Sequence, residues 1–192
     1  HMNRMPATRP LEELGALATP QVWFTVAIGT VGFGGMFAVY TYITWTMTEV
    51  GGFAENLMWL VLMAYGVGMV VGTYLGGWVS DRVGDMGLLW TLIAMAVALV
   101  AFYFSAPYGW LAVLNFGVIG MLGSTLVPNL QTRLMDVAGR AQTLAAALNQ
   151  AALNMANAGG AALGGAVIAA GLGYRAPALA GAVLATAAIA VY

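Results

Sequence analysis

The chain has 192 residues, of which 61% are hydrophobic and only 7% are charged, and its mean hydropathy is +0.87. Soluble domains carry about 25% charged residues, so this composition excludes a water-soluble domain and predicts an integral membrane protein. The net charge of −1 argues against a nucleic-acid partner, which calls for a basic patch. The absence of cysteine excludes disulfides and thiolate sites.

Residues 1–20 carry several charges and lack the apolar stretch of a secretory signal peptide. We interpret His1-Met2 as a cloning remnant and the rest as a cytoplasmic tail or linker. If Met2 is a native start, a natural half-size protein is favoured. Alternatively, residues 4–20 are the cut central linker of a longer protein.

Residues 21–192 are expected to form one transmembrane domain. A crossing helix needs about 20 apolar residues, and charge-free stretches supply them. The turn signal at residues 105–109 splits one stretch that is too long for a single crossing. The runs are continuously apolar, whereas the strands of a membrane barrel alternate. The sequence therefore predicts an all-α bundle of six transmembrane helices at residues 22–48, 57–79, 87–105, 110–130, 143–170 and 176–192. The last helix is short, as though the chain stopped before its natural end.

The arginines favour one orientation in the membrane. With six crossings both termini lie on one side, and that side holds Arg4, Arg9, Arg82, Arg133 and Arg140. The opposite side holds only Arg175. The positive-inside rule then makes both termini cytoplasmic.

A weak internal repeat links the second and fifth predicted helices. Each is the middle helix of a set of three, and each is rich in glycine. Two sets of three helices in opposite orientation are the inverted-repeat plan of many transporters. Glycines also let helix backbones approach closely, so we assign a packing role to Gly68, Gly72, Gly76, Gly160 and Gly164.

Between the second and third predicted helices the chain makes a tight, charged turn. Gly84 permits a backbone that other residues resist. Asp81 suits a neighbouring helix N-terminus, and Arg82 suits helix carbonyls or anionic lipid headgroups. On these grounds alone, an ordinary charged loop is an equally good interpretation.

The pattern G-x-x-x-D-R-x-G on Gly77, Asp81, Arg82 and Gly84 resembles the loop signature of the major facilitator superfamily. From Pro20 onward the chain is similar to the C-terminal half of bacterial twelve-helix drug:proton antiporters of the arabinose-efflux and chloramphenicol-efflux group. The resemblance implies half of a major facilitator fold, a 3+3 inverted repeat, in the bacterial inner membrane. The segments that carry it are Gly32-Phe-Gly-Gly-Met-Phe-Ala-Val-Tyr-Thr-Tyr-Ile43, Gly66-Val-Gly-Met-Val-Val-Gly72, and Asn149-Gln150 through Asn154 and Asn157 to Gly164-Gly165.

The chain departs from that family at two places. Asp85 and Met86 stand where the loop signature normally ends in two basic residues. Trp45 stands where many relatives carry a proline near the end of the first helix.

A polar stripe follows one face of the fifth predicted helix. Gln150, Asn154 and Asn157 are spaced by four and three residues, and Asn149 lies beside them. Amides in hydrocarbon are costly unless satisfied, so they face either a cavity or a partner helix. We favour cavity lining slightly, since three amides on one face exceed what a single interhelical contact needs.

Two further residues are candidates for the substrate pathway. Tyr40 lies deeper in the membrane than the aromatic belt that explains Trp45, so it is the better candidate for a ligand site. Asn115 in the fourth predicted helix is a second candidate, with interhelical hydrogen bonding as the alternative. The methionines and the pair Phe33 and Phe37 are interpreted as packing or lipid contacts.

The predicted membrane segments lack the residues that an enzyme active site would need. No predicted membrane segment contains His, Cys, Asp or Glu, so we expect no catalytic residues, metal site or cofactor. Proton coupling normally needs a titratable group in the pathway. The resemblance implies that the coupling carboxylates lie in the other half.

Two hypotheses of different classes therefore remain. In the first, the chain is half of an efflux transporter for a small amphipathic compound or drug, with sugar efflux as an alternative. In the second, it is an assembly module that dimerises without transport. The resemblance implies that halves meet through their second and fifth helices. An isolated half is then a homodimer with Gly72 at the contact and Asp81 near the partner's residues 141–143, or else it awaits a missing N-terminal half.

Overall fold

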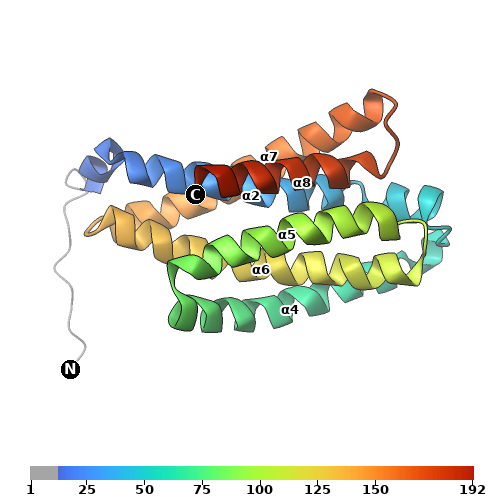
Figure 1. Ribbon diagram of the computed structural model, residues 1–192, viewed down its shortest axis with the longest axis horizontal. Coiled ribbons are helices and arrows are strands. Elements are labelled where there is room, and N and C mark those ends of the chain that lie inside the picture. The colour runs from blue at the N-terminus through green and yellow to red at the C-terminus, as the bar shows by residue number, and fades with distance from the viewer. Residues whose placement is uncertain (1–12) are drawn as a thin grey trace.

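The computed structural model describes residues 13–192, so the expectations for residues 1–12, including Arg4 and Arg9, lie outside it. The long elements are six helices: Pro20–Thr41 (α2), Met58–Val83 (α4), Asp85–Ser105 (α5), Trp110–Ala138 (α6), Gln142–Ala169 (α7) and Ala176–Val191 (α8) (Figure 1). Short turns occupy Leu14–Ala18 (η1), Ile43–Trp45 (α3), Thr46–Val50 (η2) and Glu55–Leu57 (η3).

Five of these helices are long and apolar enough to cross a membrane: α2, α4 with η3, α5, α6 and α7. The sixth, α8, is apolar but has only 16 residues. At about 1.5 Å per residue it is shorter than a hydrocarbon core of about 30 Å. The predicted all-α membrane bundle is confirmed.

The helices predicted from the sequence end near charged residues, but two of the helices continue past them. α4 continues through Asp81 and Arg82 to Val83, and α6 continues past Arg133 to Ala138. Charge does not break a helix, whereas a glycine with positive φ does. Gly84 has φ +62° and Gly139 has φ +58°, and they end α4 and α6.

The first predicted helix is not continuous. The helix α2 ends at Thr41, Tyr42 departs from helical geometry with φ −108° and ψ 12°, and α3 follows. The next segment, η2, is a short π-helix. The Thr46 hydroxyl donates to the carbonyl of Tyr174 over 2.8 Å, which ties this interrupted end to the segment between α7 and α8.

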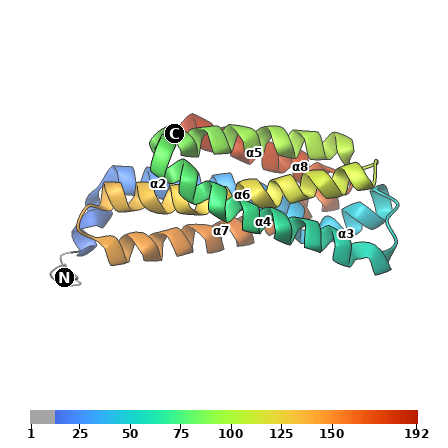
Figure 2. The same cartoon turned by 90° about the horizontal axis from the view of Figure 1, so that it is seen from below.

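The helix contacts follow the inverted-repeat plan. Exchanging α2, α4 and α5 for α6, α7 and α8 turns the most extensive pair, α4 with α6, into the next most extensive, α7 with α2. The same exchange turns the α2–α8 contact into the α6–α5 contact. In Figure 2, α5 and α8 lie together along one edge, while α7 and much of α4 lie along the other. Each set of three helices therefore packs mainly against the other set.

Glycines form close helix crossings in both sets of helices. A Cβ on Gly68 or Gly72 would collide with the carbonyl oxygen of Gly117 or Met121, respectively, so α4 lies backbone against backbone on α6. The Thr125 hydroxyl of α6 donates to the Gly72 carbonyl over 3.1 Å. Gly76 completes this face against Pro128 and Thr125.

The related crossing joins α7 to α2. A Cβ on Gly160 would collide with the Gly34 carbonyl, and one on Gly164 would lie 2.8 Å from the Tyr42 ring. The Tyr42 hydroxyl donates to the Ala161 carbonyl over 3.0 Å. The glycines singled out in the sequence therefore pack helices within one chain. The expectation that Gly72 faces a second copy is wrong, because α6 already covers it.

Both described ends of the chain lie at one end of the bundle, together with the turns that join α4 to α5 and α6 to α7 (Figure 1). Glu13 accepts a hydrogen bond from the backbone N–H of Leu144 over 3.0 Å, in the first turn of α7. A carboxylate is favourable at a helix N-terminus. The site that the sequence suggested for Asp81 of a second copy is thus served by Glu13 of the same chain.

Candidate substrate cavity

A cavity of about 370 Å³ lies among α2, α4, α6 and α7. Its lining residues come from all four helices: Phe33, Met36, Phe37, Tyr40, Tyr65, Met69, Gly123, Ser124, Val127, Gln150, Leu153, Asn154 and Asn157. The volume suits a small ligand, at the lower end of the range of about 300–1,000 Å³ for ligand pockets.

The α7 side of the cavity is an amide wall, by which we mean Gln150, Asn154 and Asn157. All three are exposed, and Gln150 Nε2 donates to Asn154 Oδ1 over a long 3.4 Å. Their donors and acceptors are therefore largely free to meet a ligand. The spacing of four and three residues places them on one face, as the sequence predicts.

The α2 and α4 side of the cavity is aromatic and apolar. The Tyr65 ring centroid lies 5.0 Å from that of Tyr40 and 4.6 Å from that of Phe116 on α6. Such offset ring contacts fix the position of each ring. Two methionines, Met36 and Met69, flank this aromatic wall.

Four of the six predicted pathway residues meet around this cavity: Tyr40, Gln150, Asn154 and Asn157. Asn149 does not, because it lies one helical step away from Gln150 and is buried against α6. Its Nδ2 donates to Gln131 Oε1 over 2.6 Å. Asn149 thus joins two helices, which was the alternative interpretation for this stripe.

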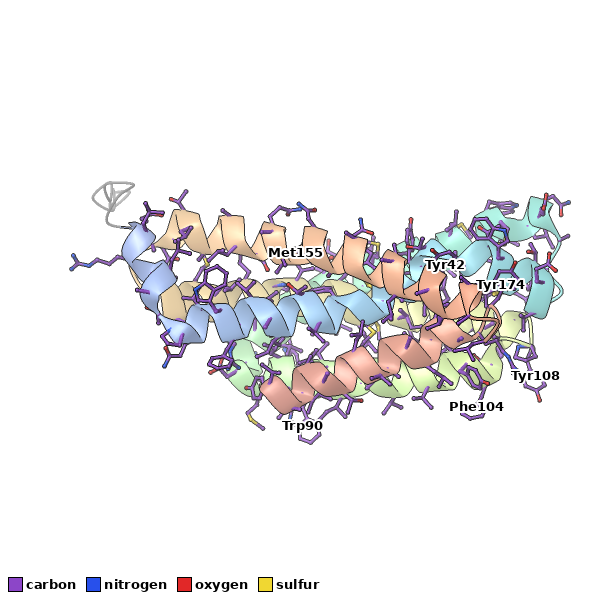
Figure 3. All side chains as sticks on the ribbon, turned by 90° about the horizontal axis from the view of Figure 1, so that it is seen from above. Tyr42, Trp90, Phe104, Tyr108, Met155 and Tyr174 are labelled. Atoms are coloured by element: carbon purple, nitrogen blue, oxygen red, sulfur yellow. The ribbon has the colours of Figure 1, made fainter. Side chains whose placement is uncertain are left out.

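Asn115 also lies away from the cavity. Its Nδ2 donates to the Ala98 carbonyl and to Ser105 Oγ, each over 3.3 Å, so it joins α6 to α5. It lines a separate apolar groove on the outer face of these helices, where Phe104 and Tyr108 point outward (Figure 3).

Sequence reasoning missed the cavity roles of Tyr65, Met36 and Ser124. Tyr65 and Met36 stand in continuously apolar runs, where nothing distinguishes the inward face from the lipid face. Ser124 lies on α6 among small residues and carries no periodic signal.

The loop signature lies beside a second polar pocket, at the turn between α4 and α5. Gly77, Asp81 and Arg82 belong to the last turns of α4, and both charged side chains are exposed. Gly84 is the turn itself. Beside it is a polar pocket of about 250 Å³ lined by Ser80, Gly84, Asp85, Asn129, Thr132, Arg133 and Asp136.

Arg133 and Tyr192 hold this end together. The Arg133 guanidinium lies 4.3 Å from the ring centroid of Tyr192, a cation–π contact, and the Tyr192 hydroxyl donates to the Asp85 carbonyl over 2.7 Å. A basic residue thus comes from α6 at the place where the loop lacks its usual basic pair. Within residues 13–192 no cluster of His, Cys, Asp or Glu could hold a metal ion.

Two inverted sets of three apolar helices around a small, partly polar cavity define a multi-pass α-helical membrane protein of transporter architecture. Residues 22–192 match the Major Facilitator Superfamily, and the chain belongs to that family. The inner membrane transport protein YdhP of Escherichia coli K12 is 37% identical over 91% of this chain. The putative transporter AraJ of the same strain is 32% identical over 93%.

A chloramphenicol resistance protein of Streptomyces lividans is 30% identical over 71% of this chain. The match covers 45% of YdhP, 45% of AraJ and 36% of the chloramphenicol resistance protein. The chain therefore spans somewhat less than half the length of these relatives, in agreement with half of a major facilitator fold.

Proposed function

We propose that this chain is half of an efflux transporter that moves a small amphipathic compound across the bacterial inner membrane by alternating access. The observation that carries the proposal is the cavity, with an amide wall on α7 opposite an aromatic wall on α2 and α4. Amphipathic compounds need both kinds of contact. The resistance protein among the relatives supports efflux of a drug.

The second half of the transporter would cover α4 and α7. Only 22% of the most apolar window of each helix is buried, compared with 44% or more in the other three spanning helices. Exposed residues of α7 include a small-residue stripe, Ala147, Ala151, Ala158 and Ala162, that suits close helix packing. The covering unit is either a second copy of this chain, forming a homodimer, or an N-terminal half.

Proton coupling would depend on that second half. The cavity lining of this chain contains no Asp, Glu or His. A titratable group within the membrane pathway is the usual site of proton transfer. A second copy of this chain would lack such a group as well, so proton coupling requires an N-terminal half that supplies the carboxylate. The distribution of arginines separately supports cytoplasmic termini.

An efflux assay tests the proposal. The gene, with any coding sequence upstream of residue 1, is expressed in a bacterial strain that lacks its own drug exporters. Lower accumulation of chloramphenicol, abolished by Asn154→Leu, is the expected result. Export of arabinose instead would support sugar efflux. If neither compound nor a wider drug panel is exported although the protein reaches the membrane, the assembly-module hypothesis is favoured.

A further inference from the structure

One hydroxyl group in the cavity has a poor hydrogen-bond acceptor. Tyr65 lines the cavity and is 7% exposed, and its hydroxyl donates to the thioether sulfur of Met36 over 3.3 Å. A thioether is a weak acceptor. Replacing the sulfur by an oxygen acceptor would therefore give this buried donor a stronger hydrogen bond and favour ligand binding.

Met36 packs against α6. Its Sδ occupies the space over Gly123, where a Cβ would overlap it. Methionine has three rotatable bonds with which to adapt. Met36 is thus the movable partner of the pair.

Tyr65, in contrast, is held in place. Its ring packs against both Tyr40 and Phe116, at centroid distances of 5.0 and 4.6 Å. The hydroxyl therefore keeps its position when Met36 moves. The ring of Tyr40, 41% exposed, presents a flat apolar surface on the same side of the cavity.

We propose that Tyr65 is a specificity-determining residue that donates its hydroxyl hydrogen to an uncharged oxygen acceptor on an aromatic ligand, and that the ligand displaces Met36. A ketone, amide or nitro oxygen has this chemistry. The cavity lining contains no Asp, Glu, Lys or Arg to balance a charged group, whose burial is costly. The inference rests on the proposed function in taking this cavity as the ligand site.

Methionine NMR of the whole chain in lipid nanodiscs provides the test. Methyl-labelled methionine gives signals for Met36 and Met69, which line the cavity, and for Met155, which is 58% exposed and outside it. Each signal is assigned by a Met→Leu substitution. Two probes of nearly equal shape are titrated: acetophenone, with a carbonyl acceptor, and α-methylstyrene, with a methylene group in its place.

Acetophenone is expected to shift the Met36 and Met69 signals and to leave Met155 unchanged. Tyr65→Phe should weaken acetophenone binding by about three- to tenfold, and it should leave α-methylstyrene binding unchanged or tighten it. Because a probe partitions into the lipid equally for every variant, comparing its affinity between variants cancels the effect of partition. Tyr74→Phe is the matched control, because Tyr74 lies on the same helix and is 76% exposed.

Met36→Leu provides a second test that leaves Tyr65 intact. Loss of the competing sulfur should tighten acetophenone binding by a few fold, read from the Met69 signal. Equal effects of Tyr65→Phe on both probes, or no shift with either probe, would overturn the inference. Neither outcome bears on the efflux assay, so the two proposals fail independently.

Discussion

Asn149 donates a 2.6 Å hydrogen bond to Gln131 and so fixes α7 against α6, whereas Asn154, five residues later, faces the cavity. Asn149→Leu should lower the free energy of unfolding by about 0.6–2 kcal/mol, since Gln131 loses its partner. Asn154→Leu should leave stability nearly unchanged and reduce ligand binding or transport. Thermal unfolding in detergent and the efflux assay together check this pair. Unfolding of the Asn154 variant would instead mean that its amide is structural.

The glycine contact between α4 and α6 predicts a second matched pair. Gly72→Ala should destabilise the fold by about 1–3 kcal/mol, because the added Cβ meets the Met121 backbone, which cannot move aside. Gly77→Ala, on the same helix with nothing within 4 Å of its Cβ, should be neutral or slightly stabilising. Equal melting temperatures for the two variants would contradict the crossing.

The exposed face of α7 predicts where a second half binds. Ala158→Phe should weaken association with a second copy or an N-terminal half without lowering the stability of the chain itself. Ala187→Phe on the exposed face of α8 is the control and should have no effect. Cross-linking in mild detergent measures the association. If the native chain cross-links neither to a second copy nor to a co-expressed N-terminal half, the proposed contact on α7 is wrong.

Membrane orientation is tested by single cysteines, which the native sequence makes easy because it contains none. Ala54→Cys should react with a membrane-impermeant maleimide in intact cells, and Thr143→Cys should react only after lysis. Both positions are exposed, and they avoid Gly52 and Gly139, where positive φ would strain a cysteine. The reverse labelling pattern would place the termini outside the cytoplasm.

Much of the fold follows from the sequence because membrane helices are encoded by long apolar runs. The helix ends were harder to predict, since Arg82 and Arg133 lie inside helices that glycines terminate. It was harder still to predict which face of each helix points into the bundle. In a soluble helix polarity marks the outer face, but in a lipid-facing helix both faces are apolar.

The same reasoning explains the mixed result for the site. Amide periodicity identified the α7 wall, because polar groups are rare enough in hydrocarbon to show which way they face. Asn149 and Gln150 are adjacent in sequence, and spacing alone could not tell which of them faces the cavity. The roles of Tyr65 and Met36 could be recognised only from the structure, in which α4 and α2 bring them to one cavity.

The strongest contacts in this bundle join the first three helices to the last three. The glycine face of α4 meets only α6, and α2 meets α7 and α8, so the leading half of the polypeptide is synthesised before most of its packing partners exist. Each triplet alone would therefore leave most of its packing surfaces uncovered. Insertion into the membrane and tertiary packing must therefore be separate events, and a chain cut near Gly109 would yield two fragments that are stable only when co-expressed.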